Sequence, residues 1–126
     1  MIELRLSILP YELAICRVDA RMPLPEWAGG RFTSITRTEE ELSIVCESSF
    51  VPERVRAERG WRSLKIAGPI AFETTGVASA IVSPLAQAKI SVFPIATFDT
   101  DYILVKVADL RAAIDVLRRA GHSVDE

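Results

Sequence analysis

The chain has 126 residues, of which 49% are hydrophobic and 25% are charged, with a formal net charge of −2 at pH 7. This composition is typical of a globular protein that folds around a hydrophobic core, and it excludes a disordered chain. Because 15 basic residues face 17 acidic ones, the sequence lacks the positive excess that extended nucleic-acid binding requires.

Signals for metal binding and for membrane targeting are weak. Cys16, Cys46 and His122 do not have the spacing of zinc ligands, and we expect no cofactor. Glu3 and Arg5 interrupt the apolar residues at the start of the chain, unlike a signal peptide. No apolar run reaches the length of a transmembrane helix, so we expect a cytoplasmic protein without a membrane partner.

The first half of the chain reads mainly as strands. Residues 2–9 alternate between apolar and polar side chains, which predicts a strand with one solvated face that pairs with the next strand as a hairpin. Pro52, followed by helix-tolerant residues, predicts a short helix over 51–58. The strands expected in this half cover residues 2–9, 13–18, 32–37 and 42–47.

The second half alternates strands with helices. A strand is expected over 61–67, and from Val77 apolar residues recur at helical spacing. Pro84 lies inside that helix and should kink it or restart it from Ser83.

A second helix is expected to start at Asp109 and to end before Gly121, because an acidic residue suits the start of a helix and glycine suits its end. Residues 122–124 can form a last short strand. His122 is expected at the surface or at a sheet edge, because the sequence places no partner beside it.

The most informative stretch is residues 91–106, SVFPIATFDTDYILVK. Two runs of β-branched and aromatic residues flank a short polar break, which predicts two strands joined by a turn. Asp99 and Asp101 lie beside hydroxyl groups in this turn, and Asn or Gly would serve better in a purely structural turn. The turn is therefore the first candidate for a site. Pro94 has no N–H, so its strand should lie at a sheet edge or contain a bulge.

The order of elements from residue 61 onward is strand, helix, strand, strand, helix, strand. This order predicts an α+β fold of the ferredoxin-like type, in which two helices cover one face of an antiparallel sheet. The first half reads as a degenerate version of the same layout. A sheet covered on one face leaves another face or an edge for a partner, so we expect a homodimer.

Three blocks of sequence resemble a known family. They are TSITRTEEELSIVC at 33–46, GWRSLKIAGPIAF at 60–72 and TGVASAIVSPLAQAKISVFPIATFDTDYILVK at 75–106. In this order they resemble the small bacterial proteins made of two fused ACT domains, and similar blocks recur in the animal cytosolic arginine sensors. The resemblance implies two tandem ferredoxin-like lobes, a degenerate one at residues 1–60 and a βαββαβ lobe at 61–126. It also implies binding of a free amino acid at a domain interface.

Carried over residue by residue, the resemblance implies a ligand pocket formed by Thr75, Gly76, Val77, Thr97, Phe98 and Asp101. The free N–H groups that open a helix at Gly76 suit the ligand carboxylate, and Asp101 suits its ammonium group. Asp99 would add a preference for a basic amino acid such as arginine. An alternative remains open, in which Gly76 only starts a helix and Asp101 only closes a turn.

Three functions follow as hypotheses. The preferred one is a non-catalytic amino-acid sensor that acts through a regulated protein in trans. The second is a metal-dependent enzyme that uses Asp99 and Asp101, although the sequence contains no glycine-rich phosphate loop and no nucleophile beside a base. The third is a structural dimerisation module without a ligand.

Overall fold

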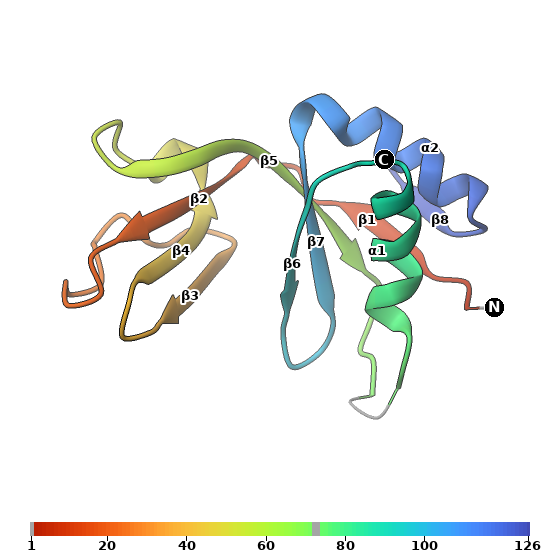
Figure 1. The fold of residues 1–126 in the computed structure, drawn as a ribbon, viewed down its shortest axis with the longest axis horizontal. Helices are drawn as coiled ribbons and strands as arrows, with labels where there is room; N and C mark the ends of the chain where they lie inside the picture. Colours follow the sequence, from red (N-terminus) through yellow and green to blue (C-terminus); the bar gives the residue numbers. More distant parts are fainter. Residues whose placement is uncertain (1, 72–73) are drawn as a thin grey trace. The chain divides into compact units, whose positions relative to one another are not determined.

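The computed structural model describes residues 2–71 and 74–126 and has a mixed α+β architecture (Figure 1). The chain divides into two compact units. The first combines Met1–Pro10 with Arg62–Glu126, and the second consists of Tyr11–Trp61. The long strand β5 (Arg56–Ile66) contributes residues to both units. None of the helices in the described residues has the length and apolar composition needed to cross a membrane.

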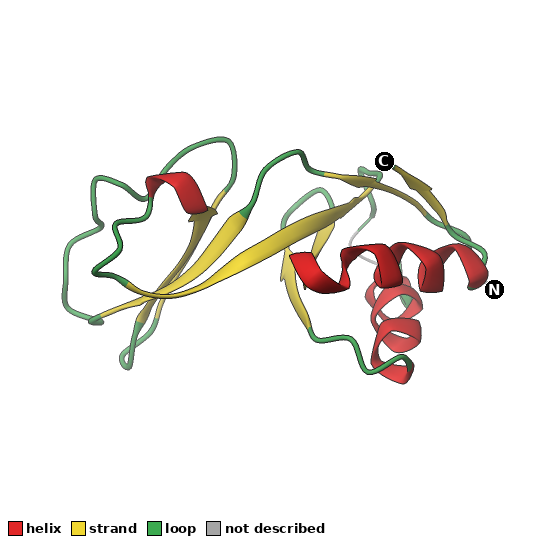
Figure 2. Cartoon of the chain, turned by 90° about the horizontal axis from the view of Figure 1, so that it is seen from above, coloured by secondary structure: helices red, strands yellow, loops and turns green. Residues whose placement is uncertain are grey.

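The first unit contains the ferredoxin-like fold that the sequence predicts. Its strands are β1 (Arg5–Ile8), the second half of β5, β6 (Val92–Ala96), β7 (Asp101–Lys106) and β8 (Ser123–Asp125), in the order β8-β1-β5-β7-β6. The helices α1 (Val77–Gln87) and α2 (Leu110–Arg119) lie together on one face of this sheet (Figure 2). A short 3-10 helix, η2 (Val107–Asp109), leads into α2.

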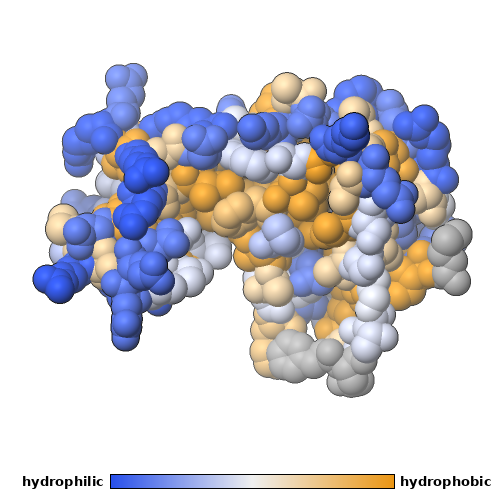
Figure 3. All heavy atoms as spheres, in the orientation of Figure 1, coloured by the Kyte–Doolittle hydropathy of each residue, from blue (hydrophilic) through white to orange (hydrophobic). Residues whose placement is uncertain are grey.

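Helical spacing of apolar residues places both helices on the core. Each turn of α1 contributes one buried residue, and α2 presents a similar stripe to the sheet. Hydrophilic side chains cover the visible outer surface of α2 (Figure 3). Gly121, with φ +97°, follows the end of α2, as the sequence predicts. The buried helix residues are Val77, Ile81 and Leu85 from α1, and Ala113, Ile114 and Leu117 from α2.

The pairing of β1 corrects the predicted N-terminal hairpin. β1 pairs antiparallel with β5 and parallel with β8, and it does not pair with the next strand along the chain. Its central residue, Leu6, is fully buried in the core of the first unit, opposite Ile66 and Val124. The hairpin prediction was wrong because burial of this side chain with the two helices decides the partner of β1.

α1 is a single helix that includes Pro84, so the predicted restart at Ser83 does not occur. Proline lacks the N–H that would bond to the Ala80 carbonyl one turn earlier. His122 Nε2 lies 3.0 Å from that carbonyl oxygen, and the Leu4 N–H donates to His122 Nδ1 at 3.1 Å. His122 directly precedes the edge strand β8, as one of the two predicted positions required, but it is buried and not at the surface. It is buried because it satisfies a carbonyl that Pro84 leaves without a helical partner.

The second unit is built from the strands β2 (Leu13–Val18), β3 (Thr33–Arg37) and β4 (Leu42–Glu47) and the first half of β5, in the order β3-β4-β2-β5. Trp27, a loop residue, is partly buried and packs against its core. Burial raises the pKa of the Cys16 thiol to about 11, so both buried cysteines act as small apolar residues. The core residues are Ala14, Cys16, Leu42, Ile44, Cys46 and Val51.

The predicted helix over residues 51–58 is absent. The structure has instead a 3-10 turn, η1 (Ser48–Phe50), followed by turns and the start of β5 at Arg56. The Arg59 guanidinium donates to the carbonyl oxygens of Ser48, Val51 and Pro52. The carbonyls of Ser48 and Pro52 also accept the N–H groups of Val51 and Val55, so turn bonds and one arginine side chain together satisfy this non-helical path.

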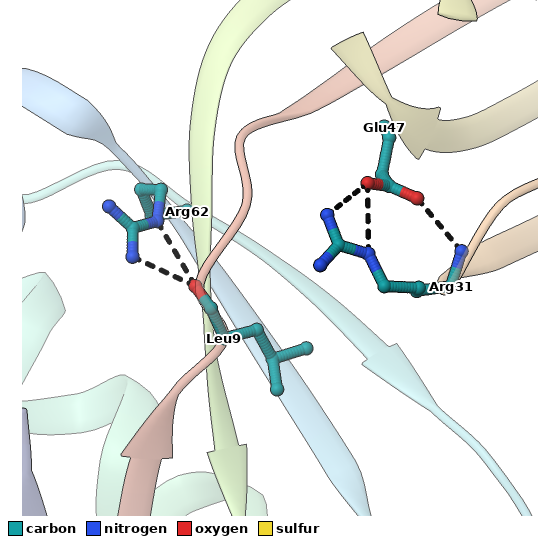
Figure 4. A network of polar contacts seen from close by, with 4 residues as sticks. All are labelled: Leu9, Arg31, Glu47 and Arg62. Carbon is teal, nitrogen blue, oxygen red and sulfur yellow. Dashed lines mark hydrogen bonds and ion pairs between the residues drawn. The ribbon is translucent and has the colours of Figure 1, made fainter. Parts of the chain in front are cut away.

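An ion pair fixes the loop before β3. Glu47 is nearly buried, and it accepts hydrogen bonds from the Arg31 backbone N–H, at 2.8 Å, and from the Arg31 guanidinium (Figure 4). These bonds hold the pKa of Glu47 below its ordinary value of 4.5. The guanidinium also lies 4.3 Å from the centre of the Tyr11 ring. Gly30 has φ +102°, and a Cβ there would clash with the Glu47 carboxylate. The close contact between the backbone at residue 30 and this carboxylate therefore requires glycine.

Candidate ligand site at the β6–β7 turn

The predicted hairpin of residues 91–106 is present as β6 and β7, with Val92 opposite Val105 and Ala96 opposite Asp101. Pro94 lies on β6, which pairs only with β7 among the described strands and is therefore an edge strand, as predicted. In the turn between them, the Thr97 N–H and the Thr97 hydroxyl both donate to the Thr100 carbonyl, at 2.9 and 2.8 Å. The turn therefore has a defined conformation.

Bonds to the end of β5 hold the turn in place. The Thr100 hydroxyl is buried and donates to the Ile66 carbonyl at 2.7 Å, while the Ile70 N–H donates to the Asp99 carbonyl at 2.7 Å. Gly68 lies so close that a Cβ there would be 3.0 Å from both the Asp99 oxygen and the Thr100 Cβ. The segment after β5 and the β6–β7 turn thus form one connected wall.

A pocket of about 210 Å³ lies at this wall. It is smaller than the pockets of about 300–1,000 Å³ that hold drug-sized molecules, so it suits one small metabolite. The described residues that line it come from three places in the first unit: the segment after β5, the start of α1, and the β6–β7 turn. They are Ile70, Ala71, Thr74, Val77, Ala96, Thr97, Phe98, Asp99, Thr100 and Asp101.

Most residues proposed from the sequence meet at this pocket. Val77, Thr97, Phe98, Asp99 and Asp101 line it, whereas Thr75 and Gly76 are exposed and do not. Sequence reasoning missed the wall after β5 and the buried Thr100. The only local signal for this wall was the Gly-Pro pair that ends β5 at residues 68–69, which marks a turn without indicating where it leads.

The start of α1 provides hydrogen-bond donors near the pocket. Gly76 precedes the helix in a left-handed conformation, with φ +78°, and no side chain in the described part of the chain caps this end of the helix. The first N–H groups of a helix have no acceptor within the helix, and Val77, the first residue of α1, lines the pocket. A Cβ at Gly76 would meet no atom within 4 Å, so its backbone conformation, not lack of space, favours glycine.

The charges at the pocket are acidic. Asp99 is exposed and Asp101 is partly buried, and neither Lys, Arg nor His is among the described residues that line the pocket. Carboxylates on the turn and N–H groups at the start of α1 offer opposite partners to one ligand: the first attract a cation and the second an anion. In residues 2–71 and 74–126, no three His, Cys, Asp or Glu side chains form a group that could hold a metal ion.

Comparison with known proteins gives matches over both halves of the chain. The model of the ACT domain matches residues 56–119, and a second model, which describes an N-terminal domain, matches residues 11–54. The cytosolic arginine sensor for mTORC1 subunit 1 of Bos taurus is 30% identical over 107 residues, which cover 76% of this chain and 32% of the bovine protein. The human protein of the same name is 40% identical over 60 residues, which cover 47% and 18%. The chain thus spans a third or less of these relatives.

Solved structures share the fold. A crystal structure of a protein from Agobacterium tumefaciens superposes with a TM-score of 0.94 at 43% identity, over 99% of this chain and 94% of that one. The regulatory subunit of aspartate kinase from Thermus thermophilus superposes with a TM-score of 0.60 at 10% identity, over 91% and 95%. Aspartate kinase from Clostridium acetobutylicum has a TM-score of 0.66 at 12% identity, over 91% of this chain and 34% of the enzyme.

Proposed function

Since this chain belongs to the ACT-domain family, we propose that it is a non-catalytic regulatory module that binds a free amino acid in the pocket at the β6–β7 turn. The observation that carries the proposal is the pairing, across one small pocket, of two aspartates on the turn with the start of α1, whose first N–H groups have no acceptor within the helix. An α-amino acid presents an ammonium and a carboxylate on adjacent bonds, so it matches donors and acceptors placed this close together.

The roles of the individual residues follow from their positions. Asp101, partly buried at the start of β7, receives the ammonium group. The N–H groups from Val77 onward receive the carboxylate, and Gly76 and Thr75 set the direction in which the chain enters α1. Asp99 and Phe98, which are exposed at the turn, contact the ligand side chain. The second carboxylate favours arginine or another basic amino acid, and relatives named as arginine sensors are consistent with this preference.

The proposal includes a homodimer and a regulated protein in trans, in the cytoplasm. β6 is an edge strand with backbone groups that do not pair with another described strand, and such edges recruit partner strands. The relatives are named as cytosolic sensors, and structural neighbours include regulatory subunits of aspartate kinases. Light scattering after size exclusion, with and without the bound amino acid, tests the dimer.

The test of ligand binding is a thermal-shift panel of the standard amino acids with the purified chain. A ligand at about a hundred times its dissociation constant stabilises the folded state by roughly 2.7 kcal/mol, which raises the melting temperature by several degrees. We expect one amino acid, arginine or another basic one, to raise the melting temperature more than all the others. A flat panel contradicts the proposal.

Two variants locate the site. Asp101→Asn should remove the ligand-induced rise while the unliganded melting temperature changes little, because Asp101 is partly exposed at the turn. Asp115→Asn removes one negative charge from an exposed residue of α2 and is the matched control. It should show the same ligand-induced rise as the original chain. An equal response of both variants would place the ligand elsewhere.

A further inference from the structure

A second pocket in the first unit shares no lining residue with the pocket at the β6–β7 turn. It has a volume of about 450 Å³, within the range of about 300–1,000 Å³ common for small-molecule sites. Ile8 from β1, Val107 from η2, Leu110 at the start of α2 and the buried Ile114 make its walls largely apolar. Three charged side chains, Arg62, Arg111 and Glu126, also line it.

Arg62 is held in a fixed orientation in this pocket. Its Nε and Nη2 atoms donate to the Leu9 carbonyl oxygen at 3.2 and 2.8 Å (Figure 4). Both bonds come from one edge of the planar guanidinium, so Nη1 remains as a donor for another acceptor. A cation whose orientation is already fixed loses little conformational entropy when an anion binds.

Arg111 already binds a carboxylate, that of Glu126, whose second oxygen lies 3.1 Å from Arg118 Nη2. Hydrogen bonding to Arg111 holds the pKa of Glu126 below its ordinary value. The Arg111 and Glu126 side chains are 60% and 45% exposed, and ion pairs this exposed contribute little stability. A competing carboxylate can therefore take the place of Glu126 at low cost.

We propose that this pocket binds a small amphipathic monocarboxylate, whose apolar chain lies against Ile8, Leu110 and Ile114 and whose carboxylate replaces that of Glu126 on Arg111. The start of α2 at Leu110 adds the positive end of its dipole to the same rim. A single carboxylate is the matching anion because Glu126 presents that group to Arg111 in the free chain. The proposal is independent of the amino-acid site, since the two pockets share no lining residue.

The experiment is isothermal titration of octanoate into the full chain at neutral pH and low salt, with octanol as the uncharged ligand of equal chain length. We expect octanoate to bind at least tenfold more tightly than octanol. Equal affinities would show a simple apolar patch and would overturn the proposal, as would absence of octanoate binding.

Two substitutions with opposite expected effects sharpen the test. Glu126→Gln removes the internal competitor and should raise octanoate affinity, whereas Arg111→Gln should lower it about tenfold, or 1.4 kcal/mol. Arg119→Gln, an exposed arginine of α2 outside the pocket, is the matched control and should leave affinity unchanged. If Glu126→Gln does not strengthen binding, or if Arg119→Gln weakens it as much as Arg111→Gln, the proposal is wrong.

The result can be separated from that for the amino-acid site. Asp101→Asn should leave octanoate affinity unchanged, because Asp101 does not line this pocket. If Asp101→Asn reduces octanoate binding, the monocarboxylate occupies the pocket at the β6–β7 turn and the second site does not exist. Because Arg111 and Glu126 are exposed, their variants should retain the fold, which circular dichroism verifies.

Discussion

Thr100 is the residue that joins the candidate pocket to the sheet. It is 5% exposed and its hydroxyl donates to the Ile66 carbonyl, at the end of β5. Its own carbonyl accepts the two bonds from Thr97 that define the turn. One residue thus sets the shape of the turn through its backbone carbonyl and the place of the turn against β5 through its hydroxyl, although it carries no charge and would not be selected from sequence as a ligand-binding residue.

Thr100→Val should destabilise the fold by about 1–3 kcal/mol, because it leaves the Ile66 carbonyl without its buried donor while it preserves the side-chain shape. Urea unfolding followed by circular dichroism measures this change. The same variant should weaken amino-acid binding, since the turn loses its anchor. Thr100→Ser keeps the hydroxyl and is the control. If the valine variant matches the original chain in stability, the hydroxyl does not hold the turn.

At the scale of elements, α1 and the two ends of the chain are joined through His122. Because the Leu4 N–H donates to Nδ1, that nitrogen is the acceptor and Nε2 carries the proton towards the Ala80 carbonyl. Within α1 this carbonyl lacks its usual partner, because Pro84 has no N–H. Pro84 and His122, far apart in sequence, therefore act together. The proline frees a carbonyl of α1, and the histidine connects that carbonyl to the residue before β1 and to the segment before β8.

A double-mutant cycle tests the coupling between Pro84 and His122. His122→Ala should cost about 1–3 kcal/mol, because it removes the ring partner of two partly buried backbone groups, the Leu4 N–H and the Ala80 carbonyl. In a Pro84→Ala background the cost should be smaller, because residue 84 then supplies the helical N–H to the Ala80 carbonyl. A coupling energy of about 0.5–3 kcal/mol between the two sites, measured by chemical unfolding, is expected. Strictly additive effects would show that His122 does not replace the missing helical bond.

The first strand of the chain pairs with strands from its second half. β1 lies between β5 and β8, so the compact unit that contains both helices includes residues from the two ends of the sequence. The Ser123 N–H donates to the Leu4 carbonyl, and Leu6 fills the core beneath the helices. The division into lobes at residues 1–60 and 61–126 stays a prediction, and the arrangement of β1 suggests how to test it.

A fragment of residues 61–126 should not fold cooperatively, because without β1 the edges of β5 and β8 are unpaired and the core lacks Leu6. Thermal unfolding followed by circular dichroism measures this. Residues 1–10 joined to 62–126 by a short Gly-Ser linker should restore a sharp transition. If the fragment of 61–126 unfolds cooperatively by itself, the later lobe is independent of the chain start.

The sequence alone determined the features that depend on local pattern. Short, mainly apolar segments at residues 13–18 and 42–47 predicted β2 and β4, and helical spacing from Val77 predicted α1. The turn at 97–100 and the edge position of Pro94 followed from backbone chemistry within a few residues. These predictions succeed because a buried face imposes its period directly on the sequence.

Contacts in the folded chain, which the sequence pattern does not reveal, settle which distant segments meet. The tertiary structure placed β1 against β5 and β8 instead of β2, buried His122 beside Ala80, and brought Ile70 to the pocket wall. It also replaced the expected helix after Pro52 with an extended path held by Arg59. Such contacts leave no local period in the sequence. The entropic cost of closing a loop of tens of residues is little higher than that of closing a short one, so sequence distance hardly restricts which segments pair. The shared core selects among the possible partners.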